Sequence, residues 1–248
     1  MIGVKELSDK IDIIAPYNLA LEGDNCGIIL DLGNKTDKIL FALDTTPETI
    51  AEAAQTGCGV IISHHPAAYY LKRNFSTEDA AILAAQRGIS LIAAHTCYDA
   101  APGGVNDVLC RLIGITDAAM FGDIGRGGSI EPMSCKAFVT HVKLVLGCDS
   151  VKAVPSAREI RRVAVIGGSV GDSVGDAVEG GYDALVTGEV RHRDGIEARN
   201  AGLCLVAAGH FSTENPSIRP LCDAVQKLIG DAAQCILSQE CADPYVSF

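Results

Sequence analysis

Residues 60–66 have the sequence Val-Ile-Ile-Ser-His-His-Pro, a short apolar run that ends in two histidines and a proline. Further short apolar runs are separated from it and from one another by segments with helical patterns, at 39–43, 91–94, 163–166, 184–186 and 203–207. This alternation is typical of βα units that form a largely parallel or mixed sheet. The sequence therefore predicts an α/β fold with mixed sheets flanked by helices.

Helix signals lie between these runs. Thr46-Pro47-Glu48 supplies a cap residue, a proline for the first turn and an acid near the positive end of a helix, and Gly57 ends that helix. A second helix is predicted over 76–88 and a third from Asn215-Pro216 to near residue 230. Apolar residues over 4–14 recur at helical spacing and predict a leading helix.

The two halves of the chain follow the same order of strand, helix, strand, helix and strand, first over 39–95 and again over 163–208. We therefore predict an internal duplication, with one α/β repeat over 1–125 and a second over 126–248. Residues 122–128 predict a loop at the join. The segment 138–146 after it is compatible with a helix or a strand.

Composition excludes several classes of function. The chain of 248 residues has a net charge of −11, which argues against binding to nucleic acid or to anionic membranes. Its apolar runs are far shorter than the ~20 residues that span a bilayer, and its first residues lack the pattern of a secretory signal. The ten cysteines include no C-x-x-C pair, which is typical of buried thiols in a reducing compartment. We expect a cytoplasmic protein with no nucleic-acid partner and no membrane contact.

Polar residues gather where the predicted strands end. His64, His65, His95 and His210 follow predicted strands, and His192 lies just beyond another. Asp99 and Glu214 each follow a histidine by four residues. Ligands of open α/β sheets bind outside the carboxyl ends of the strands. A single histidine at such a place is more often a hydrogen-bonded structural residue, but the whole set at one sheet edge favours a shared site.

The residue types at this edge suit a transition metal. Imidazole and carboxylate groups together bind Zn, Mn, Fe or Co. Five or six such ligands exceed the three of a catalytic zinc, so the count predicts two ions about 3.5–4 Å apart. Pro66 favours an extended or turn conformation at His65, which lets the adjacent histidines serve both ions. Pro216 disfavours helix at the preceding residue, which predicts that His210 and Glu214 lie on an arc rather than one helical turn apart.

A different chemistry is indicated by Gly167-Gly-Ser169-Val-Gly171, which matches the G-x-S-x-G pattern of serine hydrolases. Asp183 and His210 follow in the order that a catalytic triad requires. Glycine-rich βα turns produce this pattern readily, and a serine hydrolase would leave His64, His65 and Asp99 unexplained. We rank this alternative last.

Several blocks resemble, in order, those of the NGG-interacting factor three-like family: Gly23–Gly27, Ile62–Pro66, His95–Asp107, Thr187–Glu189 and Ala208–Glu214. Members of that family are called GTP cyclohydrolase I type 2 homologues or dinuclear metal-centre hexameric proteins. The resemblance covers nearly the whole chain. This sequence departs from the family pattern at Gly23, Cys97-Tyr98 and Arg193, where the family has Trp, Asn-Leu and His.

The resemblance implies two intertwined α/β repeats, a homohexamer and a dinuclear metal site between the repeats. The family's metal ligands fall on His64, His65, Asp99, His210 and Glu214. His95 matches a histidine that lies beside the metals in that family. These are consequences of the resemblance, and they agree with the cluster found at the strand ends.

Two functions remain open at this stage. The first is a hydrolase with two divalent metal ions that acts on a nucleotide, in the family's version a GTP cyclohydrolase that opens the imidazole ring and releases formate. His95, Glu189 and His192 would move protons. Phosphates would be neutralised by basic residues near the strand ends, at Lys72, Arg73, Arg191 and Arg193. The second is a metal-binding ring without catalysis, which stores or delivers metal or docks a protein.

Overall fold

The computed structural model describes residues 1–68, 74–169 and 171–246, and the chain divides into two compact units. Unit 1 consists of Met1–Gly104 and Ser217–Ala242, so two distant segments of the sequence build it. Unit 2 consists of Val105–Pro216 with the residues from Asp243 onward. These units are not the predicted repeats 1–125 and 126–248, whose duplication stays a prediction.

Unit 1 is built on a five-stranded sheet in the order β13-β4-β5-β6-β2. Its strands are β2 (Gly27–Leu30), β4 (Lys38–Ala42), β5 (Val60–Ser63), β6 (Ser90–Ala93) and β13 (Gln234–Leu237). Strands β13, β4, β5 and β6 are parallel, and β2 is antiparallel to β6. A separate ribbon pairs β1 (Ile2–Gly3) with β3 (Lys35–Thr36). The mixed sheet confirms the α/β prediction.

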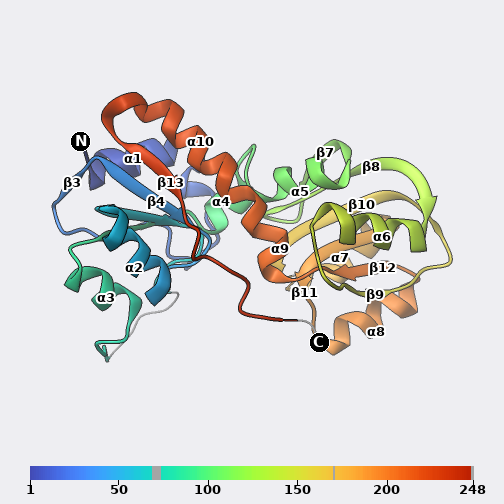
Figure 1. Cartoon of the computed structure of the whole chain (residues 1–248). Helices are drawn as coiled ribbons and strands as arrows, with labels where there is room; N and C mark the ends of the chain where they lie inside the picture. Colours follow the sequence, from blue (N-terminus) through green and yellow to red (C-terminus); the bar gives the residue numbers. More distant parts are fainter. Residues whose placement is uncertain (69–73, 170, 247–248) are drawn as a thin grey trace. The chain divides into compact units, whose positions relative to one another are not determined.

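Helices cover both faces of this sheet (Figure 1). One face carries α1 (Val4–Ile14) and α10 (Ile218–Ile229), and the other carries α2 (Pro47–Thr56) and α3 (Ala80–Gln86). The shorter elements are α4 (Thr96–Ala100) and the 3₁₀ turns η1 (Tyr17–Leu19), η2 (Asn215–Ser217) and η3 (Gly230–Ala232). Buried Ile50, Ile61 and Leu91 form part of the core between α2, α3 and the sheet.

Local sequence explains where α2 and α3 begin. The side chain of Thr46 accepts a hydrogen bond from the main-chain N–H of Thr49, and Gly57 ends α2 with a φ of +76°, as predicted. Helix α3 begins four residues later than the predicted start at Ser76. The carboxylate of Asp79 accepts a hydrogen bond of 2.8 Å from the Ser76 N–H, which forms a turn before the helix.

Unit 2 is built on a six-stranded sheet in the order β7-β8-β10-β11-β12-β9. Its strands are β7 (Thr116–Phe121), β8 (Gly125–Ser134), β9 (Lys152–Val154), β10 (Glu159–Ser169), β11 (Ala184–Glu189) and β12 (Cys204–Ala207). Strands β10, β11 and β12 are parallel and coincide with predicted runs. The remaining three strands are antiparallel to their neighbours, so this sheet is also mixed.

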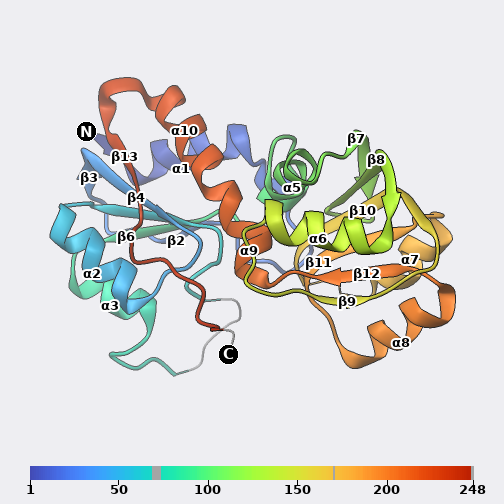
Figure 2. The same cartoon turned by 45° about the vertical axis from the view of Figure 1, so that its right-hand side comes forward.

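Alternate residues of β10 face two different cores. Val163 and Val165 pack with α5 (Val105–Ile113) and α6 (Cys135–Val145), whereas Ala164 and Ile166 pack with α7 (Ser173–Glu179) and α8 (His192–Ala201). Figure 2 shows α6 and α8 on opposite sides of this sheet. The short helix α9 (His210–Glu214) follows β12. Within the described parts of both units, no helix has the length and apolar character needed to cross a membrane.

The predicted loop over 122–128 is wrong in its second half, because Gly125–Gly128 begin β8. Glycines permit this strand to pack closely. A Cβ atom on Gly128 would overlap the carbonyl oxygen of Thr116, and one on Gly127 would overlap the hydroxyl of Tyr182. The segment that sequence left open between helix and strand forms α6.

Candidate metal-binding site

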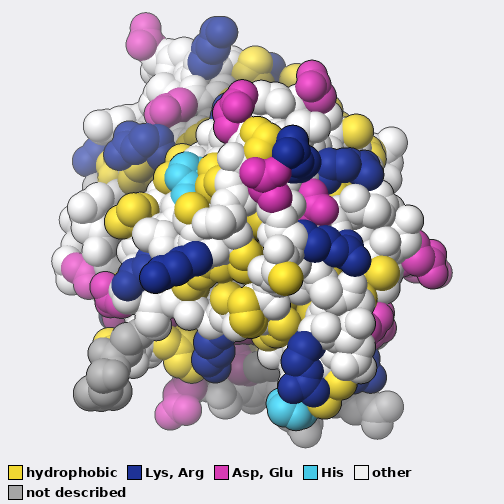
Figure 3. All heavy atoms as spheres, turned by 90° about the vertical axis from the view of Figure 1, so that its right-hand side faces the viewer, with side chains coloured by type: hydrophobic (Ala, Val, Ile, Leu, Met, Phe, Trp, Pro, Cys, Tyr) yellow, Lys and Arg dark blue, Asp and Glu magenta, His cyan; other side chains and the backbone are white. Residues whose placement is uncertain are grey.

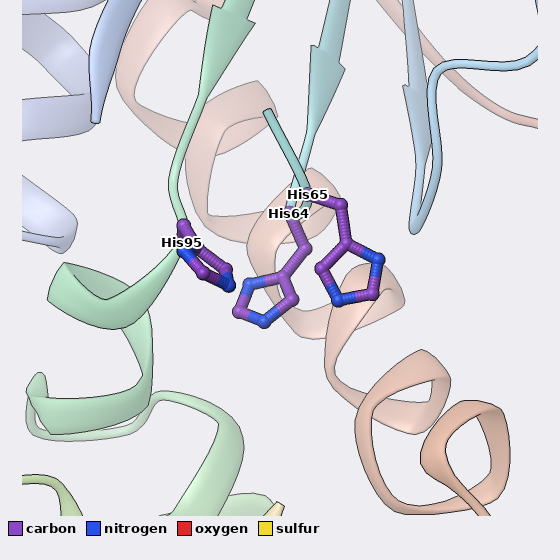
Figure 4. Close-up of side chains that lie close together, drawn as sticks. All are labelled: His64, His65 and His95. Atoms are coloured by element: carbon purple, nitrogen blue, oxygen red, sulfur yellow. The ribbon is translucent and has the colours of Figure 1, made fainter. Parts of the chain in front are cut away.

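Three histidines of unit 1 lie together at the carboxyl ends of two neighbouring strands. His64 and His65 directly follow β5, and His95 follows β6 by two residues. Figure 4 shows their imidazole rings turned toward one another, and the ring centres are 5.0–5.6 Å apart. One nitrogen from each ring lies within 4.8 Å of the others, so this group could hold a metal ion. These three histidines lie at one sheet edge as predicted. The prediction is wrong for His210 and Glu214, which follow β12 of the other sheet.

The strand register explains the meeting of these rings. Ser63 of β5 lies opposite Ala93 of β6, so residues that follow the two parallel strands leave the sheet at the same level. The N–H groups of His64 and His65 still donate to the carbonyl oxygens of Ala42 and Leu43, at 3.3 and 2.9 Å. These two bonds hold the main chain of both histidines against the end of β4.

Each of the three rings is held at Nδ1 by a hydrogen-bond acceptor. The carbonyl oxygen of Ala94 lies 2.8 Å from Nδ1 of His64. Carboxylate oxygens of Asp44 and Asp24 lie 2.7 and 2.8 Å from Nδ1 of His65 and His95. A carbonyl oxygen or an ionised carboxylate only accepts, so the proton is on Nδ1. Nε2 is then the nitrogen that would bind a metal ion, and the donor set fits such an ion.

Asp99 extends this group. It lies on α4, and its Oδ1 atom is 3.6 Å from Nε2 of His64. Both side chains are almost completely buried, at 7% and 0% exposure. A buried carboxylate is costly unless positive charge or donors compensate it. A divalent cation beside Asp99 and His64 would supply that charge, so the chemistry of this pair also fits a metal ion.

Asp24 was not selected as a site residue from the sequence, although it lies in one of the blocks that resemble the family. Burial by itself would raise the pKa of the Asp24 carboxyl, but hydrogen bonds from His95 and Thr96 outweigh it and hold the pKa well below its usual value. Asp44 directly follows the apolar run 39–43 and was not selected as a site residue from the sequence either. Its contact with His65 gives it a place beside the site.

A second group of predicted site residues lies in unit 2. Nε2 of His210 is 3.1 Å from Oε2 of Glu214, and Nδ1 of His210 is 3.6 Å from Oε1 of Glu189. The predicted arc for His210 and Glu214 is wrong, because both lie on α9, one helical turn apart. Asn215 adopts helical angles of −55° and −33° despite the proline after it, which disfavours this conformation without forbidding it.

Gly168 makes room for this second group. It has a φ of +66°, and a Cβ atom there would overlap Oε1 of Glu214 and lie 3.0 Å from Nε2 of His210. The end of β10 therefore has a glycine at position 168 because the Glu214 carboxylate occupies the space of a side chain. Gly168 is part of the Gly167–Gly171 motif, but its contact with Glu214 could not be predicted from that motif.

The serine-hydrolase alternative is contradicted by the topology of unit 2. Ser169 lies at the carboxyl end of β10, where it pairs with Glu189. Asp183 precedes β11, and its carboxylate accepts hydrogen bonds from the N–H groups of Arg161 and Arg162 near the start of β10. The two residues lie at opposite ends of adjacent parallel strands, so they cannot belong to one triad.

The remaining residues predicted from the sequence, His192 and four basic residues, are not members of either group. His192 is the first residue of α8, and its side chain is exposed. Arg191 and Arg193 form ion pairs with Asp172 at 2.8 and 2.6 Å. The candidate phosphate-binding residues Lys72 and Arg73 lie outside the described residues.

Comparison with known proteins gives this site a family context. The model of the family Duf34/NIF3 (NGG1p interacting factor 3) matches residues 2–244. The chain belongs to this family. That membership confirms the resemblance inferred from the His64-His65-Pro66 and Ala208–Glu214 blocks.

Relatives of this NIF3-family chain carry two kinds of name. It is 30% identical to the "GTP cyclohydrolase 1 type 2 homolog" of Clostridium perfringens, over 97% of this chain and 98% of that protein. It is 29% identical to "NGG1-interacting factor 3" of Saccharomyces cerevisiae, over 89% of this chain and 88% of that protein. A solved Bacillus cereus protein related to NIF3 has the same fold, with a TM-score of 0.91, 21% identity and 99% coverage of both chains.

Proposed function

We propose that this NIF3-family chain binds two divalent metal ions and uses them to hydrolyse a nucleotide. The ligands would be the five residues assigned from the sequence, His64, His65 and Asp99 in unit 1 and His210 and Glu214 in unit 2. Zn, Fe, Mn and Co all suit this set of imidazole and carboxylate groups. The names of the relatives suggest GTP as the nucleotide, with opening of the imidazole ring and release of formate.

The observation that carries this proposal is the convergence of three imidazole rings in unit 1. Three ring nitrogens lie within 4.8 Å of one another, with the Asp99 carboxylate 3.6 Å from one of them. Divalent ions bound by such groups supply Lewis acidity and lower the pKa of water. The protein's part is to fix the orientation of the imidazole rings with Nε2 presented, which the acceptors at Nδ1 do.

Proton transfer is assigned to His95, Glu189 and His192, as the sequence predicts. Glu189 is half-exposed and lies 3.6 Å from Nδ1 of His210, so its carboxylate reaches both solvent and the second group. Nε2 of His95 lies beside the rings of His64 and His65 while Asp24 holds its Nδ1. In both cases a titratable atom lies next to a proposed metal ligand.

A pocket in unit 2 supports a small-molecule substrate. It has a volume of about 770 Å³, within the range of ligand sites, and His210 and Glu189 line it. Phe211 and Tyr245 add aromatic surface to the same pocket, and Lys152 adds a basic group. These are groups that can contact a base and a phosphate.

Metal content and turnover on the same samples test the proposal. Protein purified without added metal is analysed for ions per chain and then for release of formate or phosphate from GTP and other nucleotides. The variants His64→Ala and Glu214→Ala remove one ligand from each group. His141→Gln is the control, because Nε2 of His141 donates to the Ile113 carbonyl oxygen in unit 2 and His141 belongs to neither group.

We expect about two ions per chain in the wild type and in the control, and a loss of ions and of turnover in both ligand variants. His95→Ala, which removes none of the five assigned ligands, is expected to lose turnover. Turnover that survives complete removal of metal would contradict the proposal. Two ions without turnover of any nucleotide would favour the non-catalytic role in metal storage, delivery or protein docking.

A further inference from the structure

The three histidines of unit 1 differ in what holds them. The acceptor at Nδ1 of His64 is a main-chain carbonyl, whereas those of His65 and His95 are the carboxylates of Asp44 and Asp24. We propose that Asp24 and Asp44 are positioning residues, which fix His95 and His65 with the proton on Nδ1 and with Nε2 directed at the centre that the three rings share (Figure 4).

The proposal rests on the chemistry of the imidazole ring. A neutral imidazole carries its proton on either nitrogen, and in water both forms are populated. A carboxylate at hydrogen-bond distance from Nδ1 selects the form with the proton there, because it accepts and cannot donate. The same bond fixes the rotation of the ring. Where the other nitrogen binds a metal, loss of such a partner commonly costs 10- to 100-fold in affinity.

Asp24 is fully engaged by donors. Its Oδ1 accepts from Nδ1 of His95 and from the Asn25 N–H, each at 2.8 Å. Its Oδ2 accepts from the Thr96 N–H at 3.1 Å, from the Thr96 hydroxyl and from the Cys26 thiol at 3.2 Å. Only 10% of the side chain is exposed. A main-chain N–H therefore faces each of the two oxygens.

An asparagine cannot replace Asp24 in this network. Whichever way its amide is turned, the NH₂ group meets the N–H of Asn25 or the N–H of Thr96, and one donor is left facing another. The Asp24→Asn substitution changes few atoms, yet it removes the arrangement that holds His95. This carboxylate links residues 24–26 to the start of α4, so His95 depends on a contact between distant parts of the sequence.

The side chain of Asp44 is more exposed to solvent than that of Asp24. Its Oδ1 lies 2.7 Å from Nδ1 of His65, and 34% of its side chain is exposed. An asparagine here can keep a carbonyl oxygen on Nδ1 and turn its NH₂ group to solvent. The Asp44→Asn variant should therefore retain the tautomer of His65, whereas Asp44→Ala should lose it. We therefore expect replacement by asparagine to disturb the histidine tautomer at Asp24 and to preserve it at Asp44.

Nuclear magnetic resonance of metal-free protein labelled with ¹⁵N-histidine measures the tautomers directly. In the wild type, His64, His65 and His95 are expected to carry the proton on Nδ1. Asp24→Asn is expected to change the His95 signals alone, and Asp44→Ala the His65 signals alone, so each variant is the control for the other. Asp44→Asn is expected to resemble the wild type.

A wild-type spectrum with the proton on Nε2 of His65 or His95 would overturn the proposal, and this result does not depend on whether Asp24→Asn folds. Unchanged His95 signals in a folded Asp24→Asn protein, or unchanged His65 signals in Asp44→Ala, would overturn it as well.

Metal affinity adds a second readout, which rests on the proposed function. Competition between the protein and a chelator for Zn²⁺ is expected to show a 10- to 100-fold weaker affinity in Asp44→Ala than in Asp44→Asn. Equal affinities would count against a positioning role for Asp44. A wild type that binds no Zn²⁺ but has the expected tautomers would contradict the proposed function and still support the positioning of both rings.

Discussion

Unit 2 requires a residue without a side chain at position 168. Its φ of +66° is unfavourable for other residues, and the space of its Cβ atom is taken by the carboxylate of Glu214. A substitution there has two separate effects. The positive φ costs about 1–2 kcal/mol of stability for a residue with a Cβ atom, and the overlap displaces a proposed metal ligand.

We expect Gly168→Ala to lower the free energy of unfolding and the metal content together. Gly171→Ala is the matched control, because Gly171 lies three residues further along the chain with a φ of +59° and a Cβ atom there would meet no described atom within 4 Å. Urea unfolding should show a loss of about 1–2 kcal/mol in both variants, with a loss of metal in Gly168→Ala alone. Equal metal content in the two variants would contradict the role assigned to Glu214.

Tyr17 predicts a dependence of stability on alkaline pH. Burial raises the pKa of its hydroxyl to about 12, against the opposing effect of its hydrogen bond with Ser8. In the unfolded chain this group ionises near pH 10. The unfolded state therefore loses the proton first, and the contribution of Tyr17 is complete below about pH 10 and falls between about pH 10 and 12.

Thermal melting of the wild type and of Tyr17→Phe over this pH range tests the prediction. The wild type should lose stability more steeply than the variant, which has no hydroxyl to ionise. Parallel curves would show that the Tyr17 pKa is not raised in the folded protein.

The residues of the site differ in how readily sequence shows them. His64, His65, His95 and His210 were predicted because each follows an apolar run, and ligands bind at the carboxyl ends of strands. That the strands belong to two sheets could not be predicted from these runs. The role of Asp24 could not be predicted in this way. Its partner His95 lies 71 positions along the chain, and their contact depends on how the loop before β2 folds back onto α4.

Helix α2 illustrates a prediction at the level of one element. Thr46 and Thr49 exchange hydrogen bonds at its start, with the Thr46 side chain accepting at 3.3 Å and the Thr49 hydroxyl accepting from the Thr46 N–H at 2.8 Å. Thr46→Ala should lower the free energy of unfolding by about 1 kcal/mol. Thr46→Ser keeps the acceptor and should cost less. Urea unfolding that ranks serine below alanine would contradict this account of the cap.

Strands buried on both faces were predicted more reliably than the other strands. An apolar run such as 163–166 indicates a buried strand because both faces of β10 are covered by helices. The β7–β8 hairpin lacks this signal, since its glycines match the composition of a loop and become a strand only through close packing against Thr116 and Tyr182. For α9, the local bias imposed by Pro216 was outweighed by the bonds of the helix before it.

At the scale of the whole molecule, the homohexamer implied by the family resemblance stays a prediction. Large apolar side chains are exposed in both units, among them Ile13 and Phe75 in unit 1 and Met120 and Leu144 in unit 2. Figure 3 shows one face on which hydrophobic side chains (yellow) lie among basic ones (dark blue). Such exposed apolar residues are compatible with contacts between copies of the chain.

We expect light scattering after gel filtration to give about 155 kDa, the mass of six chains in a closed ring, since one chain has 25.9 kDa. A species with the mass of a single chain across the accessible range of concentrations would contradict the hexamer.

Unit 1 is built from two separate segments of the sequence, and local sequence patterns could not predict this. Residues 217–242 return to it because β13 pairs with β4 in parallel, and the sequence between the two strands contains all of Val105–Pro216. A parallel pairing over such a separation leaves no mark in the periodicity of either strand.

This pairing has a consequence for how the chain is made on the ribosome. The sheet of unit 1 stays without one edge strand until Gln234–Leu237 have left the ribosome, whereas the whole of Val105–Pro216 leaves it earlier. During translation we therefore expect the nested segment to become resistant to protease before the segment that was synthesised first. Nascent chains that end at residue 216 or at residue 248, each followed by an unstructured linker long enough to fill the ribosomal exit tunnel, would be stalled and treated briefly with protease to show the order. Protection of residues 1–104 in the shorter chain would refute it.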